Sequence, residues 1–356
     1  MSTPPSFQLF TSIRYDPLLL TSTENSRPDL NFVTPSPFYM LTYHRDRMVE
    51  AAQHFDFDTV TSALSDGPAL HNELLRRVKT WQAQEGVKDG PLKLRILFDT
   101  AGHMTVDFLS IPTVPLSTLY PTSLDPPNAG PETHPANKPF KPSPLTGGAL
   151  ELGPGTTLPA GNQDPNWRPQ DEPAPPSSWT LRLDTESTPR TPFTLLKTTQ
   201  REPYDASRAR ALPTNPKSAV HTEVILFNNV HEVTEGTLTS LYFFRGGRWV
   251  TPPVGEPEAF KFESAENGSN GDGGAAEREA DHADEGELRK PFPGRWGHSV
   301  RSPKVGAGGQ RGTSRRWALG SGFCMEEPVG VETVQVGEGV WVSNGVRGFG
   351  YGVVVA

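Results

Sequence analysis

The sequence has one cysteine, no long apolar run and no excess of positive charge, and each shortage excludes a class of protein. Cys324 alone cannot form an internal disulfide or a zinc site built on several thiolates, and it suits a reducing compartment. No apolar run approaches the length of a membrane span. The net charge of −8 gives no electrostatic reason to expect nucleic acid or an acidic membrane as partner.

The N-terminal stretch "MSTPPSFQLF" also lacks the charged segment and apolar run of a secretory signal. The histidines offer no metal site either, because the sequence contains no HExxH and none of the other usual ligand spacings. These absences together predict a cytoplasmic chain without a metal.

Proline and glycine, in contrast, are abundant: the 356 residues include 37 prolines and 34 glycines, and only 34% are hydrophobic. They concentrate in a proline-rich segment at 120–178 and in a segment at 256–309 that is glycine-rich and acidic, then basic. Neither can bury enough apolar surface to offset its ordering entropy, so both are predicted to be low-complexity insertions. An N-terminal domain at 1–119 and a C-terminal domain at 179–356 remain, the latter interrupted by the second insertion.

The N-terminal part reads as α+β. Residues 7–15 alternate like a strand, and 43–55 and 69–86 have helical periodicity. Gly86 can close the second helix. Residues 92–109 read as a β-hairpin with Ala101 and Gly102 at the turn.

The C-terminal part is rich in expected strands, which are 179–183, 193–197, 222–228, 236–244 and 339–345. Short helices are expected at 203–211 and 313–319. "RGGRW", at 245–249, reads as a tight turn between strands around Leu241 and Val250.

Four features of the two predicted domains could carry chemistry, namely Lys197, Glu235, residues 312–314 and Arg47. Lys197 closes an apolar run, and a lysine held on a rigid element with a depressed pKa can form a Schiff base with an aldehyde cofactor. A strand-end lysine that reaches for solvent is the commoner case. Glu235, followed by Gly236, could keep a pyridine nitrogen protonated so that the ring accepts electrons. Acids at strand entrances are usually solvated instead.

The other two features suit a phosphate. Gly312, Thr313 and Ser314 precede or begin a helix, where free N–H groups, hydroxyls and the helix dipole bind anions. An ordinary N-cap is the alternative. Arg47 lies on a predicted helix, and its planar guanidinium suits a phosphate. The alternative is that Arg47 simply lies on the solvated face of that helix.

Six stretches resemble, in their order and spacing, the class-IV aminotransferase family, which are the fold-type IV pyridoxal-phosphate enzymes. They are "FTSIR", "HRDR", "LLKTTQR", "TEG", "GTSR" and "SNGVRG". Within that family, "KTTQREPYDASRAR", "EVILFN" and "RGTSRRWAL" are most similar to aminodeoxychorismate lyases of the eukaryotic kind. The family often has Asn where Ser240 stands here.

The resemblance implies a two-domain α+β fold like that of D-amino-acid aminotransferase, pyridoxal 5′-phosphate as cofactor, and a homodimer. It implies that Lys197 is the catalytic lysine that condenses with the cofactor. The residues implied to bind the cofactor with it are Arg47, Glu235, Gly312, Thr313, Ser314, Ser343 and Asn344. Arg14 and Arg201 are candidates for the carboxylates of a small-molecule substrate, with a surface salt bridge as the alternative for either.

The function that the resemblance implies is a lyase that converts 4-amino-4-deoxychorismate to 4-aminobenzoate and pyruvate, a step of folate precursor synthesis. Lys197 would take the C4 proton. The alternatives are an aminotransferase for a branched-chain or D-amino acid, and a non-enzymatic relative whose insertions bind a partner.

Overall fold

The computed structural model describes residues 7–125, 179–189, 191–212, 221–254 and 309–356. The two predicted insertions, 120–178 and 256–309, lie almost wholly outside these ranges. Their edges are described and buried: Tyr120 and Leu124 pack in the core, and Gly309 forms an isolated bridge with Val254. The described residues on either side of 125–175 belong to one compact unit.

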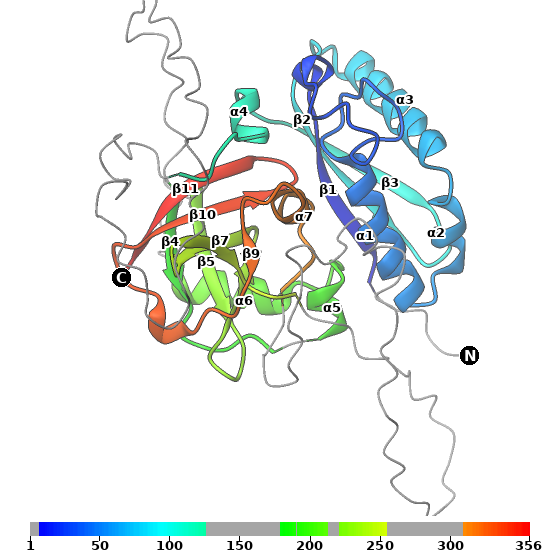
Figure 1. Cartoon of the computed structure of the whole chain (residues 1–356). Coiled ribbons are helices and arrows are strands. Elements are labelled where there is room, and N and C mark those ends of the chain that lie inside the picture. Colours follow the sequence, from blue (N-terminus) through cyan, green and yellow to red (C-terminus); the bar gives the residue numbers. More distant parts are fainter. Residues whose placement is uncertain (1–6, 126–178, 190, 213–220, 255–308) are drawn as a thin grey trace, which may run out of the picture. The chain divides into compact units, whose positions relative to one another are not determined.

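The first sheet has three antiparallel strands in the order β1-β2-β3, formed by Leu9–Tyr15, Leu92–Phe98 and Met104–Ser110. Three helices accompany it in Figure 1, namely α1 (Leu41–His54), α2 (Asp58–Ala63) and α3 (Gly67–Glu85). Alternate residues of β1 and β2, among them Ile13, Leu94 and Ile96, are fully buried in the core that these helices share. The other face of this sheet carries Phe10 and Leu97 together with the charged side chains of Arg14, Lys93 and Arg95.

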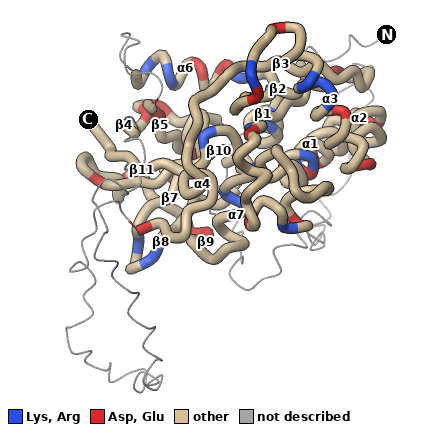
Figure 2. The backbone as a smooth tube through the Cα atoms, turned by 90° about the horizontal axis from the view of Figure 1, so that it is seen from above, with Lys and Arg blue, Asp and Glu red and all other residues tan. Residues whose placement is uncertain are grey.

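Helix α3 illustrates how the sequence determines this layer. The Asp66 carboxylate accepts from the Ala69 N–H at 2.8 Å and caps the first turn. Leu70, Leu74 and Val78 form the buried stripe. Gly86 ends the helix with a φ of 63°, a left-handed conformation that favours glycine. The helix also carries charged residues of both signs (Figure 2), such as Glu73, Arg76 and Lys79. The predicted helix, its stripe and its terminating glycine are confirmed.

The predicted hairpin is also confirmed. Asp99 organises the turn between β2 and β3, because its carboxylate accepts from the N–H groups of Ala101 and His103. Gly102 takes a φ of 84° there.

The second sheet has eight strands in the order β6-β5-β4-β11-β10-β7-β8-β9. Their bounds, in chain order from β4 to β11, are Trp179–Leu183, Thr222–Phe227, Val233–Gly236, Ser240–Arg245, Arg248–Thr251, Met325–Glu326, Gly339–Asn344 and Gly348–Val355. The pairs β4·β5, β4·β11 and β8·β9 are parallel, and the other pairs are antiparallel. A mixed sheet of this kind, together with the helices, confirms the predicted α+β class.

The remaining helices are short. They are α4 (Leu116–Leu119), α5 (Pro192–Leu195), α6 (Glu202–Ala211), α7 (Thr313–Gly320) and the 3₁₀ helices Pro17–Thr21 and Val331–Thr333. Within the described ranges, no helix is long and apolar enough to cross a membrane. The predicted helices at 203–211 and 313–319 are confirmed as α6 and α7.

The strand predicted at 193–197 is wrong, because this stretch begins as the helical turn α5. Thr191 is its N-cap: the side chain accepts from the Thr194 N–H, Thr194 reciprocates, and Pro192 occupies the first turn. The apolar residues that suggested a strand, Leu195 and Leu196, are buried all the same. Lys197 follows with a φ of 49°, which is unusual for a residue other than glycine.

The strand predicted at 236–244 is also too long. Gly236 ends β6, residues 237–239 turn, and β7 begins at Ser240. The buried Glu223 carboxylate holds this turn by accepting from the hydroxyls of Thr237 and Thr239 and from the Leu238 N–H. Glu235 consequently lies within β6 and not ahead of a strand.

Strand β11 was not predicted from the sequence, and it contains two interior glycines, which are uncommon in strands. Gly350 and Gly352 are needed for packing: a Cβ atom at Gly350 would lie 2.2 Å from Nε1 of Trp179, and one at Gly352 would lie 2.6 Å from Cβ of Trp179. The absent side chains therefore make room for the indole of β4.

Candidate active site

Lys197 is held in place by the edge of β1. The Phe10 N–H donates to the Lys197 carbonyl at 3.3 Å, Leu9 bridges to Thr198, and the Thr199 N–H donates to the carbonyl of Gln8 at 2.9 Å. The lysine backbone thus continues the first sheet on the side opposite β2. Its half-buried side chain places Nζ 5.1 Å from the centre of the Phe10 ring.

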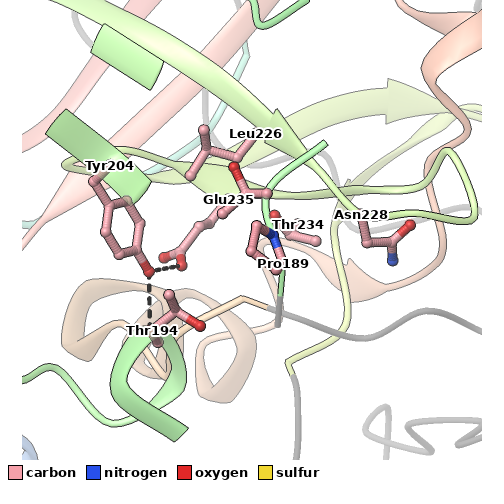
Figure 3. Close-up of a pocket in the computed structure, with 8 residues that line it drawn as sticks. Pro189, Thr194, Tyr204, Leu226, Asn228, Thr234 and Glu235 are labelled. Atoms are coloured by element: carbon pink, nitrogen blue, oxygen red, sulfur yellow. Dashed lines mark hydrogen bonds between the residues drawn. The ribbon is translucent and has the colours of Figure 1, made fainter. Parts of the chain in front are cut away.

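Glu235 and Tyr204 point toward each other from β6 and α6 (Figure 3). The Tyr204 hydroxyl donates to Oε1 of Glu235 at 2.7 Å, and it also lies 2.9 Å from the Thr194 carbonyl. Gln310 connects this pair to the lysine: its Nε2 donates to the Tyr204 hydroxyl at 3.0 Å, and its Oε1 accepts from Nζ of Lys197 at 3.5 Å. One chain of contacts therefore links Lys197 to Glu235.

The ionisation of both end groups is perturbed. Burial lowers the pKa of Lys197 well below its usual value, and the positive charges of Arg47 and Arg201 lower it further. Burial raises the pKa of Glu235, against the opposing effect of the hydrogen bond from Tyr204. Burial and the neighbouring cations thus favour the neutral amine of Lys197, and the pKa of Glu235, raised to about 7, lets its carboxylate accept a proton near neutral pH.

A second chain of contacts starts at Arg47 on α1. Its Nη2 donates to Oγ1 of Thr11 at 2.6 Å, and that hydroxyl lies 2.7 Å from Nδ1 of His44. Nε2 of His44 lies 3.3 Å from Oγ1 of Thr313. Burial lowers the pKa of His44 well below its usual value, so the ring is neutral and one of its nitrogens carries the proton. His44 thus connects the Thr11 hydroxyl, which accepts from Arg47, to the Thr313 hydroxyl.

Arg47 has unused binding capacity. It is only 9% exposed, burial lowers its pKa from 12.5 to about 10, and its Nε has no hydrogen-bond partner among the described residues. Buried guanidinium donors are rarely left unpaired. This one is suited to an anion.

The start of α7 lies beside this arginine, since Nη1 of Arg47 donates to the Arg311 carbonyl at 3.5 Å. Its N-cap is Gly312, which provides no side-chain cap for the first-turn N–H groups. Gly312 is required by space, because a Cβ atom there would lie 2.3 Å from Oγ of Ser240. An uncapped helix start next to a buried, partly unpaired arginine can bind a phosphate.

Ser314 and Ser343 face each other behind this helix start. Oγ of Ser314 lies 2.8 Å from Oγ of Ser343, which in turn lies 2.7 Å from the Tyr242 hydroxyl. Asn344 shapes the next turn, because its Oδ1 accepts from the N–H groups of Val346 and Arg347. Ser343 and Asn344 thus have protein partners, and their predicted contact with a cofactor stays a prediction.

Arg14 is in a different situation from Arg47. It is 1% exposed, and all three guanidinium nitrogens are used: Nε donates to Asp16, Nη1 to the Val346 carbonyl and Nη2 to the Pro112 carbonyl. These contacts account for its burial without a ligand. Its predicted role toward a substrate carboxylate gains no support from them.

Several cations gather near Lys197. Phe10 lies between Lys197 and Arg95, with the Arg95 guanidinium 5.1 Å from its ring. Lys93 shares the polar face of β2, where burial and the charges of Arg347, Arg95 and Arg201 lower its pKa. Arg201 stacks on the Tyr204 ring at 4.5 Å and donates to the Thr237 carbonyl. The one carboxylate paired with Arg95 among the described residues, Asp107, is 3.7 Å away and largely exposed.

A small pocket adjoins the other side of Glu235. It contains about 250 Å³ of empty space, part of it open, and Thr194, Leu226 and Thr234 help to line it together with Tyr204 and Glu235 (Figure 3). Lys197 and Arg47 do not line it.

The structure adds residues that were not predicted from the sequence: His44, Tyr204 and Gln310 in the two chains of contacts, and Lys93 and Arg95 among the nearby cations. Each acts through partners distant in sequence, so no local spacing indicated it. Tyr204 offered the best signal, since it lies in the segment after Lys197 that was expected to be helical.

No family model matches the chain, and no curated protein sequence matches it. Solved structures do resemble it at low identity. A protein assigned as an amino-acid aminotransferase from Mesorhizobium loti has 15% identity and a TM-score of 0.48, with 98% of this chain and 100% of that chain covered. The 4-amino-4-deoxychorismate lyase of Pseudomonas aeruginosa has 13% identity and a TM-score of 0.46, with 98% and 83% covered.

The branched-chain amino acid aminotransferase of Escherichia coli has 12% identity and a TM-score of 0.45, with 98% of this chain and 76% of that chain covered. Similarities at this level assign no function to the chain. The case for function rests on its own residues.

Proposed function

We propose that the chain is a pyridoxal-phosphate-dependent lyase that converts 4-amino-4-deoxychorismate to 4-aminobenzoate and pyruvate. The observation that carries the proposal is a set of contacts through residues 310–312. Gln310 and Tyr204 connect Lys197 to Glu235, and the Arg311 carbonyl connects Arg47 to the start of α7. These contacts link an amine, a carboxylate and a phosphate-type anion site, which is the set of groups that this cofactor requires.

The residues fit the cofactor at each of its ends. Arg47, with its unpaired buried Nε, and the uncapped start of α7 would hold the phosphate, joined by the Thr313 hydroxyl. Glu235 would meet the pyridine nitrogen, and Tyr204 would hold Glu235 in position. Lys197 would bind the aldehyde carbon. When bound, the cofactor supplies an electron sink for the charge left by proton removal.

The protein's own groups supply the acid–base step. The Lys197 amine, kept neutral by burial and nearby cations, accepts the proton from C4 of the substrate. The bond from C3 to the enolpyruvyl oxygen then breaks, and the departing enol takes up a proton to become pyruvate. The ring becomes aromatic as 4-aminobenzoate. Atoms and electrons balance without an oxidant or an amino acceptor.

The substrate carries two carboxylates, which favours a site with excess positive charge. Lys93, Arg95 and Arg201 provide that charge beside Lys197. These residues are better placed for the carboxylates than Arg14, each of whose guanidinium nitrogens already has a partner within the protein.

The test is to incubate purified protein with pyridoxal phosphate and 4-amino-4-deoxychorismate and no keto acid. Formation of 4-aminobenzoate and pyruvate in equal amounts supports the lyase. Amino transfer that needs a keto-acid acceptor would instead identify an aminotransferase. A protein that stays colourless with the cofactor would exclude both.

Lys197→Ala should abolish the yellow absorbance of the protein with its cofactor, whereas the control Lys79→Ala, an exposed residue on α3, should keep it. A homodimer, implied by the family resemblance, and a cytoplasmic location, predicted from the composition, remain part of the proposal. Light scattering of the purified chain tests the first, and fractionation of the source cells tests the second.

A further inference from the structure

The segment Gly309–Gly312 contacts the side chains of Arg47, Lys197 and Tyr204. Gly309 packs against β6, where a Cβ atom would lie 2.6 Å from the Thr234 carbonyl oxygen. The Arg311 carbonyl accepts from Arg47, and Gly312 begins α7. Between the two glycines, Gln310 is only 8% exposed. The fold thus presents one polar side chain to the interior from a backbone with little freedom to move.

The amide of Gln310 has one orientation that satisfies its neighbours. Lys197 can donate to an amide oxygen, so Oε1 lies toward Nζ at 3.5 Å and Nε2 donates to the Tyr204 hydroxyl at 3.0 Å. The flipped amide would place its oxygen beside Tyr204 and attract the hydroxyl hydrogen, which could then no longer go to Glu235.

The hydrogen bonds therefore run in one direction, from Lys197 through Gln310 and Tyr204 to Glu235. The backbone N–H of Gln310 also donates to the Glu235 carboxylate. The same residue contacts both the amine and the acid, through its side chain and its backbone. A buried network in which every member is satisfied has a single arrangement.

We propose that Gln310 is a positioning residue: it holds the Lys197 amine and turns the Tyr204 hydroxyl toward Glu235. This inference rests on the proposed function for its consequence in catalysis, but the contacts belong to the protein without its cofactor. A glutamine that only filled space would affect stability and leave the ionisation of Lys197 unchanged. The pKa of Lys197 is thus the deciding measurement.

Two substitutions test the proposal in cofactor-free protein. Gln310→Leu removes both hydrogen bonds at similar volume. Gln310→Glu is nearly isosteric, keeps the acceptor toward Lys197, adds negative charge and loses the donor toward Tyr204. Gln84→Leu, at an exposed position on α3, is the matched control. Circular dichroism checks that each variant folds, and the glutamate variant remains informative if the leucine variant does not.

The assay is competitive acetylation of Lys197 against pH, read by mass spectrometry of its peptide. Gln310→Glu should raise the apparent pKa by about one pH unit or more, and Gln310→Leu should lower it by up to about one unit. The charged groups around the amine are unchanged in every variant; they are His44, Arg47, Lys93, Arg201 and Glu235. Differences between variants therefore report residue 310.

An apparent pKa in both Gln310 variants equal to that of the Gln84→Leu control would overturn the proposal. That failure is separate from failure of the proposed function. If wild-type protein does not bind pyridoxal phosphate, the function falls while the acetylation result still judges Gln310. If it binds the cofactor and both variants keep the wild-type pKa, Gln310 alone loses its role.

Discussion

Replacing Arg47 with methionine should raise the stability of the cofactor-free protein and lower its affinity for pyridoxal phosphate. The guanidinium is buried, and its pKa falls from 12.5 to about 10, so the charged form is disfavoured in the folded protein. The buried charge of Arg47 therefore lowers the free energy of unfolding at every pH below about 10, neutral pH included. An aliphatic side chain of similar length removes this charge and with it the anion site.

The magnitudes follow from the structure. The difference between 12.5 and about 10 corresponds to roughly 3 kcal/mol against folding at neutral pH. The variant also loses hydrogen bonds to Thr11 and to the Arg311 carbonyl, together about 2 kcal/mol. A net gain of about 1 kcal/mol is expected without cofactor. Loss of the charged contact to phosphate, about 3 kcal/mol, should weaken pyridoxal phosphate binding by roughly two powers of ten.

The assay pairs urea unfolding of the cofactor-free protein with a spectrophotometric titration of pyridoxal phosphate. Arg76→Met is the control, because Arg76 is exposed on α3 and pairs only with Glu73 among the described residues. It should change neither quantity by much. A variant Arg47→Met that is less stable than wild type and keeps its affinity would refute the reasoning, because Arg47 would then be a structural residue.

Three further predictions follow from single contacts. Because the pKa of Glu235 is raised in the folded protein, its ionisation destabilises the cofactor-free protein only when the pH is above the ordinary pKa of 4.5. Glu235→Gln should therefore be more stable than wild type in urea unfolding at pH 8 but not at pH 4. Equal gains in stability at both pH values would contradict this prediction. Ser343→Ala should cost about 1–3 kcal/mol in thermal unfolding, since the buried Tyr242 hydroxyl loses its partner; an unchanged melting temperature would count against that network. Lys93→Met should raise KM for the dicarboxylate substrate about tenfold with little effect on kcat, and an unchanged KM would remove Lys93 from substrate binding.

The sequence predicted best those elements that local patterns specify. The stripe and terminating glycine of α3, the Asp99 turn of the hairpin and the glycine turn between β7 and β8 each depend on neighbours in sequence. Two errors arose where local signals conflicted. At 193–197 the apolar run suggested a strand, although Thr191 and Pro192 are typical of a helix start. Strand β11 was missed because glycine is uncommon in strands, yet Gly350 and Gly352 are needed there to make room for Trp179.

The candidate site was predictable only in part. Lys197, Glu235 and Arg47 carry recognisable neighbours in sequence, and the structure links them through one set of contacts. Gln310 and His44 carry no such signal, because each depends on partners more than thirty residues away. The same limit applies to Arg14, whose burial with Asp16 and two distant carbonyls no local pattern announces.

The backbone pairing between β1 and residues 197–199 has a practical consequence when the chain is shortened for expression. Backbone bonds from Gln8, Leu9 and Phe10 anchor the segment that bears the reactive amine. A recombinant version shortened by a few residues past Phe7 would leave every assigned side chain intact and still release that segment. Tags, cleavage sites and start codons should therefore be placed ahead of Phe7.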